Sequence, residues 1–395
     1  MNAADTAWVM TASALVLLMS LPGLALFYGG LVRARNLLSV FAQVFAIAAL
    51  MSLTWLAAGY ALAFGTGNGL LGGLVDARPW FMAGVDAEAL RGSLPEIAFF
   101  TFQMTFAVIT PALIVGAFAE RISFGFVLAF SAIWLLVVYA PVAHWIWGGG
   151  MMADGGMFGA LGTRDFAGGI VVHETAGLAA LVLAIMVGPR RHRTTPPHSP
   201  GLVAIGAGML WVGWFGFNGG SQLAADGTAA MAITVTHLSA AAATLSWAAW
   251  ERVKFGRSSL VGIVTGTIAG LASITPASGY VAPWQAVLIG AVAGVLCQEA
   301  VLLIRHRFGI DDTLDVFAVH GVGGIFGTIM IAVLGLGSAM AQLGALLIVG
   351  LWTVAATWAI ARGLSLVIPL RVDHESEVNG LDLSTHGERA YDVNS

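Results

Sequence analysis

The feature that most constrains this 395-residue chain is a long series of apolar stretches, one after another from the first residues almost to the last. Each is about 20 residues long, which lets an α-helix cross the ~30 Å hydrocarbon core of a bilayer. Hydrophobic residues make up 58% of the sequence and charged residues 10%, too little polar surface to cover a soluble body of this size. The stretches lack the polar and apolar alternation of a membrane barrel. The sequence therefore predicts an all-α integral membrane protein.

Breaks in hydropathy at Arg, Asp and Gly/Pro clusters divide the chain into eleven predicted spans. Their ranges are 7–31, 38–64, 97–118, 123–145, 167–187, 202–222, 229–250, 259–275, 284–303, 314–335 and 341–367. The first span is expected to be retained, because the segment before it carries Asp5 and no basic residue, unlike a signal peptide. The composition changes after the last span, so we divide the chain into a membrane domain, residues 1–370, and a tail, residues 371–395.

The basic residues of the loops fall mainly on one side of the predicted membrane. The richer side holds Arg33, Arg35, Arg121, Arg190, Arg191, Arg193, Arg252, Lys254, Arg257, Arg305 and Arg307, and the poorer side holds Arg78, Arg91 and Arg164. By the positive-inside rule the richer side is cytoplasmic, which predicts an external N-terminus and a cytoplasmic C-terminus. The net charge of -4 gives no sign of nucleic-acid binding, and the single cysteine, Cys297, excludes an intrachain disulfide.

Two histidines lie inside predicted spans, His173 in the fifth and His320 in the tenth. Five spans followed by five more place the second set upside down, as in inverted-repeat transporters, so the two histidines are expected to meet near the middle of the membrane. Ionisable groups there usually mark a substrate or proton route. The plainer alternative is a hydrogen bond between helices, which we expect for His237. A metal site lacks ligands, because the adjacent Glu174 points about 100° away on a helix.

Aromatic residues give a second set of candidates. Trp147 follows His144 at the entry to a glycine-rich loop, where no membrane span requires it. A small cation resting on its ring face would gain about 2 kcal/mol when desolvated. Phe102 and Phe106 are one helical turn apart and so share a face, which taken alone is more typical of core packing.

Six ordered motifs then resemble a known family. They are Phe27-Tyr-Gly-Gly-Leu-Val-Arg33, Gly116-Ala-Phe-Ala-Glu-Arg121, Asp165-Phe-Ala-Gly-Gly169, Trp211-Val-Gly-Trp-Phe-Gly-Phe-Asn-Gly-Gly-Ser221, Thr275-Pro-Ala-Ser-Gly-Tyr280 and Asp315-Val-Phe-Ala-Val-His-Gly321. Together they resemble the ammonium transporter (Amt/Mep/Rh) family, and in particular its bacterial Amt branch. The resemblance covers nearly the whole chain, from the first span to Gly380-Leu-Asp-Leu-Ser-Thr-His-Gly-Glu388 in the tail.

The resemblance implies an eleven-helix subunit of a homotrimer in the cytoplasmic (inner) cell membrane, with one pore in each subunit. It also implies a role for several groups of residues. Phe102, Phe106, Trp147 and Ser221 match an external ammonium-recruitment site, Phe106 and Phe217 match a gate of stacked phenyl rings, His173 and His320 match the twin histidines of the pore, Trp214 and Thr275 match residues that line or flank these elements, and Asp165 matches an acid whose charge favours a cation at the entrance.

Elementary chemistry fits these roles. Ammonium and potassium attract a ring face alike, but the Ser221 hydroxyl can accept an N–H bond that potassium cannot supply, and an unmet acceptor costs about 1–3 kcal/mol. Burial between phenyl rings lowers the pKa of an amine, so ammonium is expected to lose its proton near the gate. Neutral ammonia would then pass the histidines, whose nitrogens can donate or accept.

A transporter of ammonium, with methylammonium as an analogue, is thus the leading prediction. The alternative is an ammonium sensor that signals through its cytosolic tail. An enzyme is not expected, since the sequence lacks a nucleophile, a metal set or a cofactor motif, and we expect no cofactor.

Three further residues or segments carry expectations. Glu174 is unusual for the family, and as a buried acid it is expected to face either a neighbouring helix or a subunit interface. Asp315 is expected to cap the start of the tenth span, where an acid satisfies free N–H groups. The tail keeps apolar residues that a free end has little reason to carry, so we expect it to dock on cytosolic loops including residues 190–193 and to couple subunits. The resemblance also implies a PII-type signalling partner there.

Overall fold

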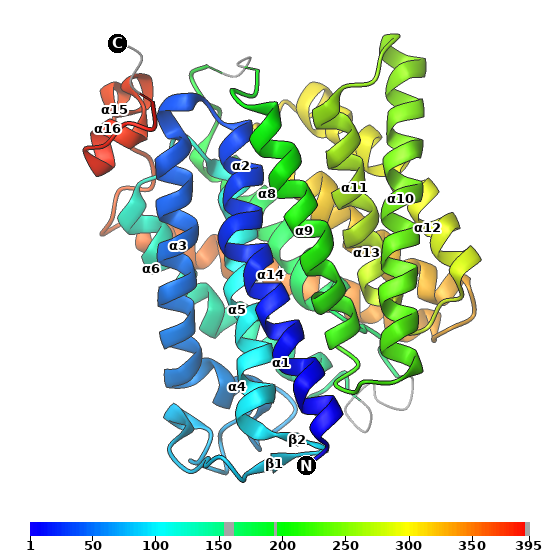
Figure 1. Cartoon of the computed structure of the whole chain (residues 1–395). Helices are drawn as coiled ribbons and strands as arrows, with labels where there is room; N and C mark the ends of the chain where they lie inside the picture. The colour runs from blue at the N-terminus through cyan, green and yellow to red at the C-terminus, as the bar shows by residue number, and fades with distance from the viewer. Residues whose placement is uncertain (154–161, 193–195, 392–395) are drawn as a thin grey trace.

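The computed structural model describes residues 1–153, 162–192 and 196–391. In this part of the chain ten helices are long and apolar enough to cross a membrane, and a shorter apolar helix covers Phe317–Val333. Figure 1 shows them side by side in one bundle, with the two termini at opposite ends. The predicted all-α architecture is confirmed, and each of the eleven predicted spans overlaps one of these helices.

The helices and their bounds follow the chain. They are α1 (Ala3–Leu18), α2 (Ala25–Leu31), α3 (Leu37–Thr54), α4 (Tyr60–Phe64), α5 (Glu96–Phe118), α6 (Phe124–Trp134), α7 (Ala140–Ile146), α8 (Thr175–Val187), α9 (Pro200–Gly220), α10 (Gly227–Phe255), α11 (Leu260–Ile274), α12 (Pro283–Leu302), α13 (Val322–Val333), α14 (Ala339–Leu364), α15 (His374–Asn379) and α16 (Leu381–His386). Pairs such as α1 and α2 form one span, because a π-helical turn, here Met19–Leu24, joins them without a break. A short hairpin, β1 (Leu90–Arg91) and β2 (Leu94–Pro95), precedes α5.

Polar caps fix where several helices begin. The side chains of Asn2, Ser199, Asp226, Ser259 and Ser338 each accept hydrogen bonds from amides in the first turn of the helix that follows. Such caps satisfy N–H groups that have no partner within the helix. The caps therefore set the ends of α1, α9, α10, α11 and α14.

A buried arginine ties three loops together at the end of the bundle that carries the C-terminus. Arg121 is 0% exposed and donates to carbonyl oxygens of Gly188 and Asp311 and to the hydroxyl of Thr313. Five donors in a rigid fork suit one guanidinium to several acceptors at once. Beside it, Arg190 pairs with the carboxylate of Asp311 at 2.9 Å. The loops after α5, after α8 and before α13 are thereby held in register.

The tail docks on this same end of the bundle, as predicted. The Glu377 side chain accepts the backbone N–H of Arg191 at 2.9 Å, and Arg371 at the start of the tail donates to the carbonyl oxygens of Val187 and Pro189. Arg33 donates to the carbonyl oxygen of Glu377, and Arg35 to that of Val378. Figure 1 shows α15 and α16 against the C-terminal end of the bundle, beside α3. Arg193, also expected in this contact, lies outside the described residues.

Asp315 does not cap the tenth span, so that prediction was wrong. Its side chain pairs with Arg305 at 2.6 Å, because its φ of 59° turns it away from the helix start. The acid that accepts the backbone N–H of Phe317 is Asp312, at 2.7 Å. The capping role exists, but a neighbouring carboxylate fills it.

We expect Asp311→Asn to lower the melting temperature of the purified protein at neutral pH. Burial by itself would raise the pKa of Asp311, but the hydrogen bonds and charge of Arg190 lower it below its ordinary value. A lowered pKa in the folded state adds stability above the ordinary pKa, and this stability is lost as the pH falls through the lower value. The difference in melting temperature between variant and wild type should therefore become smaller as the pH falls below about 4. The control is Asp86→Asn, which replaces an exposed acid at the opposite end of the bundle and should leave the melting temperature unchanged. A difference between Asp311→Asn and wild type that does not change with pH would contradict the assignment.

Candidate functional site

Two histidines from distant spans meet inside the bundle. His173 lies in the π-helical turn Gly169–Glu174 and His320 in the π-helical turn Phe317–Gly321, so the fifth and tenth spans carry the same local distortion. Such turns occur often at functional sites. The two Nδ1 atoms are 3.3 Å apart and the rings are stacked at 27°. The structure therefore brings the two rings within hydrogen-bonding distance of each other.

The contact restricts the protons of the pair. When both rings are neutral, one Nδ1 donates and the other accepts, so the two rings must be in different tautomers. One ring then has an Nε2 that accepts and the other an Nε2 that donates. The Nε2 of His173 is buried and has no hydrogen-bond partner among the described residues. The pair can thus offer both a donor and an acceptor to a small polar molecule.

A narrow cavity beside the pair has an almost wholly apolar lining. Its walls include Phe27, Leu113, Val172, Trp214 and Phe217, along with the two histidines. Trp214 stacks on His173 with ring centroids 5.5 Å apart, and its Nε1 donates to the Thr275 hydroxyl at 2.9 Å. Thr275 is fully buried. Trp214 therefore lines the cavity, while Thr275 flanks it and fixes the indole.

Two phenyl rings close the outer end of this cavity. Phe106 from α5 and Phe217 from α9 are stacked with centroids 4.2 Å apart, and Phe217 also stacks on His173. Phe102 is 0% exposed and packs edge-on behind Phe106, with centroids 5.0 Å apart. The structure thus brings the two predicted gate rings together and places Phe102 in the packing behind them.

An outer vestibule lies beyond the phenyl pair. Phe106, Trp147 and Ser221 all line it, although they come from three separate segments. The Trp147 ring is perpendicular to that of Phe106, and its Nε1 donates to the backbone carbonyl of Asp165 at 2.8 Å. The Ser221 hydroxyl donates to the carbonyl of Phe217 at 2.8 Å, which leaves its oxygen free to accept. Three of the four residues expected at the recruitment site therefore share this hollow.

Other residues of the vestibule were not anticipated from the sequence. Gln103 lines it, and its Oε1 is buried without a partner among the described residues. Phe166 also lines it and packs edge-on against Tyr280. The helical spacing of Gln103 and Phe106, three residues apart, was the signal that could have identified the first of them.

Asp165, expected to act at the entrance through its charge or to have a structural role, holds a turn of the backbone. Its carboxylate is 5% exposed and accepts the backbone N–H groups of Gly168, Gly169, Ile170 and Val171 at 2.6–3.0 Å. An acid in this position satisfies the open end of a helix and complements its dipole. Asp165 therefore holds the turn that carries His173.

On the inner side, a larger cavity continues the route. Its lining includes Tyr28, Arg190, Glu251, Arg305 and His320. His320 lines both this cavity and the narrow one. The vestibule, the narrow cavity and the inner cavity are thus arranged in series, divided by the phenyl pair and the histidine pair.

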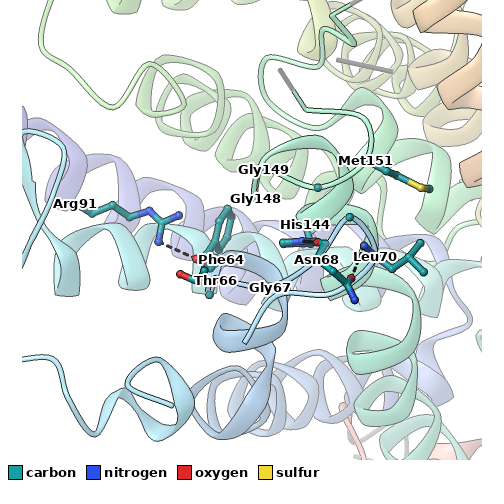
Figure 2. Close-up of a pocket in the computed structure, with 13 residues that line it drawn as sticks. Phe64, Thr66, Gly67, Asn68, Leu70, Arg91, His144, Gly148, Gly149 and Met151 are labelled. Atoms are coloured by element: carbon teal, nitrogen blue, oxygen red, sulfur yellow. Dashed lines mark hydrogen bonds between the residues drawn. The ribbon is translucent and has the colours of Figure 1, made fainter. Parts of the chain in front are cut away.

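Figure 2 shows a separate outer pocket between two glycine-rich loops, residues 65–70 and 148–151. The ring nitrogens of His144 lie 3.0 Å from the carbonyl oxygen of Ala63 and 2.7 Å from that of Asn68, and Arg91 donates to the carbonyl of Phe64. The side chains of His144 and Arg91 are thus bonded to backbone carbonyl oxygens. The pocket shares Phe64 and Gly149 with the lining of the vestibule. In the described ranges no group of three or more His, Cys, Asp or Glu side chains could hold a metal.

Glu174 faces a neighbouring helix, one of its two expected positions. It is 1% exposed, and its Oε1 lies next to Gly350 of α14, 3.2 Å from where a side chain there would begin. Its Oε2 has no partner within the described part of the chain.

The chain is similar to known proteins both in sequence and in structure. The model of the Ammonium Transporter Family matches residues 7–391. The chain is 42% identical to an ammonium transporter of Bacillus subtilis, over 99% of both chains. It is 40% identical to the ammonium transporter Amt1 of Archaeoglobus fulgidus, over 99% of this chain and 100% of the relative. Among solved structures, a sensor Amt protein matches with a TM-score of 0.89 at 32% identity, over 97% and 98% of the two chains. Candida albicans Mep2 matches with a TM-score of 0.85 at 33% identity, over 95% and 88%.

We expect Gly177→Ala to destabilise the protein by forcing α8 away from the π-helical turn that carries His320. A side chain at Gly177 would begin 2.3 Å from the Cα of Gly321, immediately after His320. Backbone cannot yield as a flexible side chain can, and overpacking of this kind costs about 1–3 kcal/mol. Thermal unfolding of the purified protein should show a lower midpoint. In the matched control Gly344→Ala, where nothing lies within 4 Å of the new atom, the midpoint should not fall. Equal midpoints for both variants would show that the close approach is not required.

Proposed function

This chain belongs to the ammonium transporter family, and we propose that it recruits ammonium in the outer vestibule, deprotonates it near the phenyl pair and conducts ammonia past the two histidines. The single observation that carries this proposal is the series of three hollows, divided by the Phe106–Phe217 stack and the His173–His320 contact. A multi-pass membrane protein of this family performs transport rather than a chemical conversion of its substrate.

Recruitment rests on three groups that face the vestibule. The rings of Phe106 and Trp147 line the vestibule, and the attraction between a cation and a ring face is worth about 2 kcal/mol when the cation is desolvated. The Ser221 oxygen, whose own proton is engaged with Phe217, accepts an N–H bond. Potassium has no such bond to give, so the hydroxyl supplies the preference for ammonium.

Deprotonation follows from the change in surroundings beyond the vestibule. The stacked phenyl rings separate a hollow with polar groups from a narrow cavity whose lining is apolar apart from the histidines. Transfer of an ion into such a space is costly, whereas neutral ammonia enters at much lower cost. The proton therefore passes to water on the outer side, in the vestibule, and ammonia then meets one nitrogen that donates and one that accepts.

The wider arrangement is part of the same proposal. We propose a homotrimer in the cytoplasmic cell membrane, with the N-terminus outside and the docked tail in the cytosol. The tail contacts at Arg191 and Arg35 hold the tail against the body of the chain, and we propose that from there it couples subunits and binds a PII-type signalling protein. Sensing of ammonium through the tail is the second candidate, favoured by the likeness to a solved sensor Amt protein.

Uptake of labelled methylammonium by proteoliposomes tests the function. Purified protein in vesicles should give uptake above that of empty vesicles, and ammonium should compete with it. A protein that binds ammonium without conducting it would bind the label but show no uptake, which would favour the sensor. A current recorded on a solid-supported membrane after an ammonium step would show whether charge accompanies the ammonia.

We expect Trp147→Leu to lower the apparent affinity for ammonium, and so to alter uptake, in the same vesicles. The indole supplies a wall of the vestibule and is fixed by its bond to the backbone of Asp165. Loss of about 1–2 kcal/mol of cation–π attraction would reduce the apparent affinity about 5- to 30-fold. Trp352→Leu is the control, because this tryptophan is 39% exposed on α14, outside the vestibule. Similar losses in both variants would count against the assigned site.

A further inference from the structure

A hollow at the docked tail has walls from two parts of the chain. The body contributes Arg33, Arg35 and His198, and the tail contributes Arg389 and Tyr391. Arg33 and Arg35 lie between the first two spans, and Arg389 follows α16. We propose that this hollow binds a phosphate-bearing anion, which links the tail to the body of the transporter.

The arginines of the hollow are only partly neutralised. Arg33 is paired with Glu120 at 3.3 Å. Arg35 donates to the backbone carbonyl of Val378 and has no ion pair within the described residues, and Arg389 has neither a hydrogen bond nor an ion pair there. Two guanidinium groups, one from the body and one from the tail, are therefore left to share an anion. Their planar forks suit the oxygens of a phosphate.

One acid, Asp382, also lines the hollow, and one of its carboxylate oxygens binds a backbone amide of α3. The Oδ1 of Asp382 accepts the backbone N–H of Ser39 at 2.8 Å, in the first turn of α3. An acid there complements the positive end of the α3 dipole. Its Oδ2 is buried without a partner among the described residues. The arginines outnumber this single carboxylate, so the hollow remains cationic.

A helix terminus adds to the positive potential of the hollow. Ser199, which caps the 21-residue helix α9, lines the hollow, so the positive end of that helix dipole is close by. His198 donates through Nδ1 to the carbonyl of Val32, because a carbonyl only accepts. Its Nε2 lies 3.3 Å from the Tyr391 hydroxyl, which joins the tail to the body at the edge of the hollow.

Occupancy would strengthen tail docking, since the ligand contacts both walls only when the tail is docked. By linkage, a ligand that binds the docked state alone favours that state in proportion to its saturation. Two sources share the chemistry. One is a soluble phosphate compound, and the other is the headgroup of an anionic lipid, because Arg33 and Arg35 lie where two spans leave the membrane.

The test uses the full chain in nanodiscs and measures hydrogen exchange of residues 381–391. In phosphatidylcholine discs, inorganic phosphate at ten times its dissociation constant should slow this exchange about elevenfold, while chloride at equal ionic strength should not. Protection in phosphatidylglycerol discs without added phosphate would identify the lipid headgroup as the ligand.

Variants separate the anion site from the docking itself. Arg389→Gln removes a side chain that makes no bond in the described chain, so exchange without an anion should stay as in wild type and the anion-dependent protection should be lost. Arg257→Gln, an exposed arginine in the loop after α10, should keep that protection. The proposal is overturned if neither phosphate nor phosphatidylglycerol slows exchange, if chloride acts equally, or if Arg389→Gln retains the effect. The readout does not involve transport, so it stands apart from the uptake assay.

Discussion

The contact between His173 and His320 is the interaction on which the rest of the site depends. It requires two spans to approach at backbone distance, which the facing glycines Gly177 and Gly321 permit. It also requires each span to carry a π-helical turn at the same point. Trp214 and Phe217 both stack on the ring of His173, so their arrangement depends on that contact. Close packing of small residues substitutes here for the hydrophobic effect, which does not draw helices together in lipid.

The ends of the histidine spans are held by a different kind of interaction. Asp165 binds the amides before His173, and Asp312 binds an amide before His320, so one carboxylate precedes each π-helical turn. The second of these lies in the loop that Arg121 holds through Thr313. Because Glu120 next to it pairs with Arg33 and Arg190, the loops around the tail and the start of the tenth span belong to one polar network. The tail and the turn that carries His320 are therefore physically connected at this end.

The bilayer explains how much could be predicted from the sequence. A span must be long and apolar, so hydropathy located all eleven spans, and the order of the spans located the meeting of His173 with His320. Finer features depend on angles that hydropathy does not report. Which of two nearby acids caps the tenth span was decided by the positive φ of Asp315. Whether Phe102 or Gln103 faces the vestibule was decided by the rotation of α5. The sequence named Asp315 and Phe102, and in each case the backbone conformation placed a nearby residue there instead.

The proposed route gains its selectivity from the order of its groups rather than from any one of them. The ring walls of the vestibule attract potassium and ammonium alike, and the Ser221 oxygen favours the ion that can donate a hydrogen bond. The narrow cavity then admits only a species that can lose its charge, which potassium cannot do. Beyond the phenyl pair, a donor and an acceptor on the paired histidines replace the water that ammonia leaves behind. If the histidines came before the phenyl rings, they would offer their nitrogens to any hydrated cation. The stack of Phe217 on His173 fixes the opposite order, since one ring closes the vestibule and the next begins the pair.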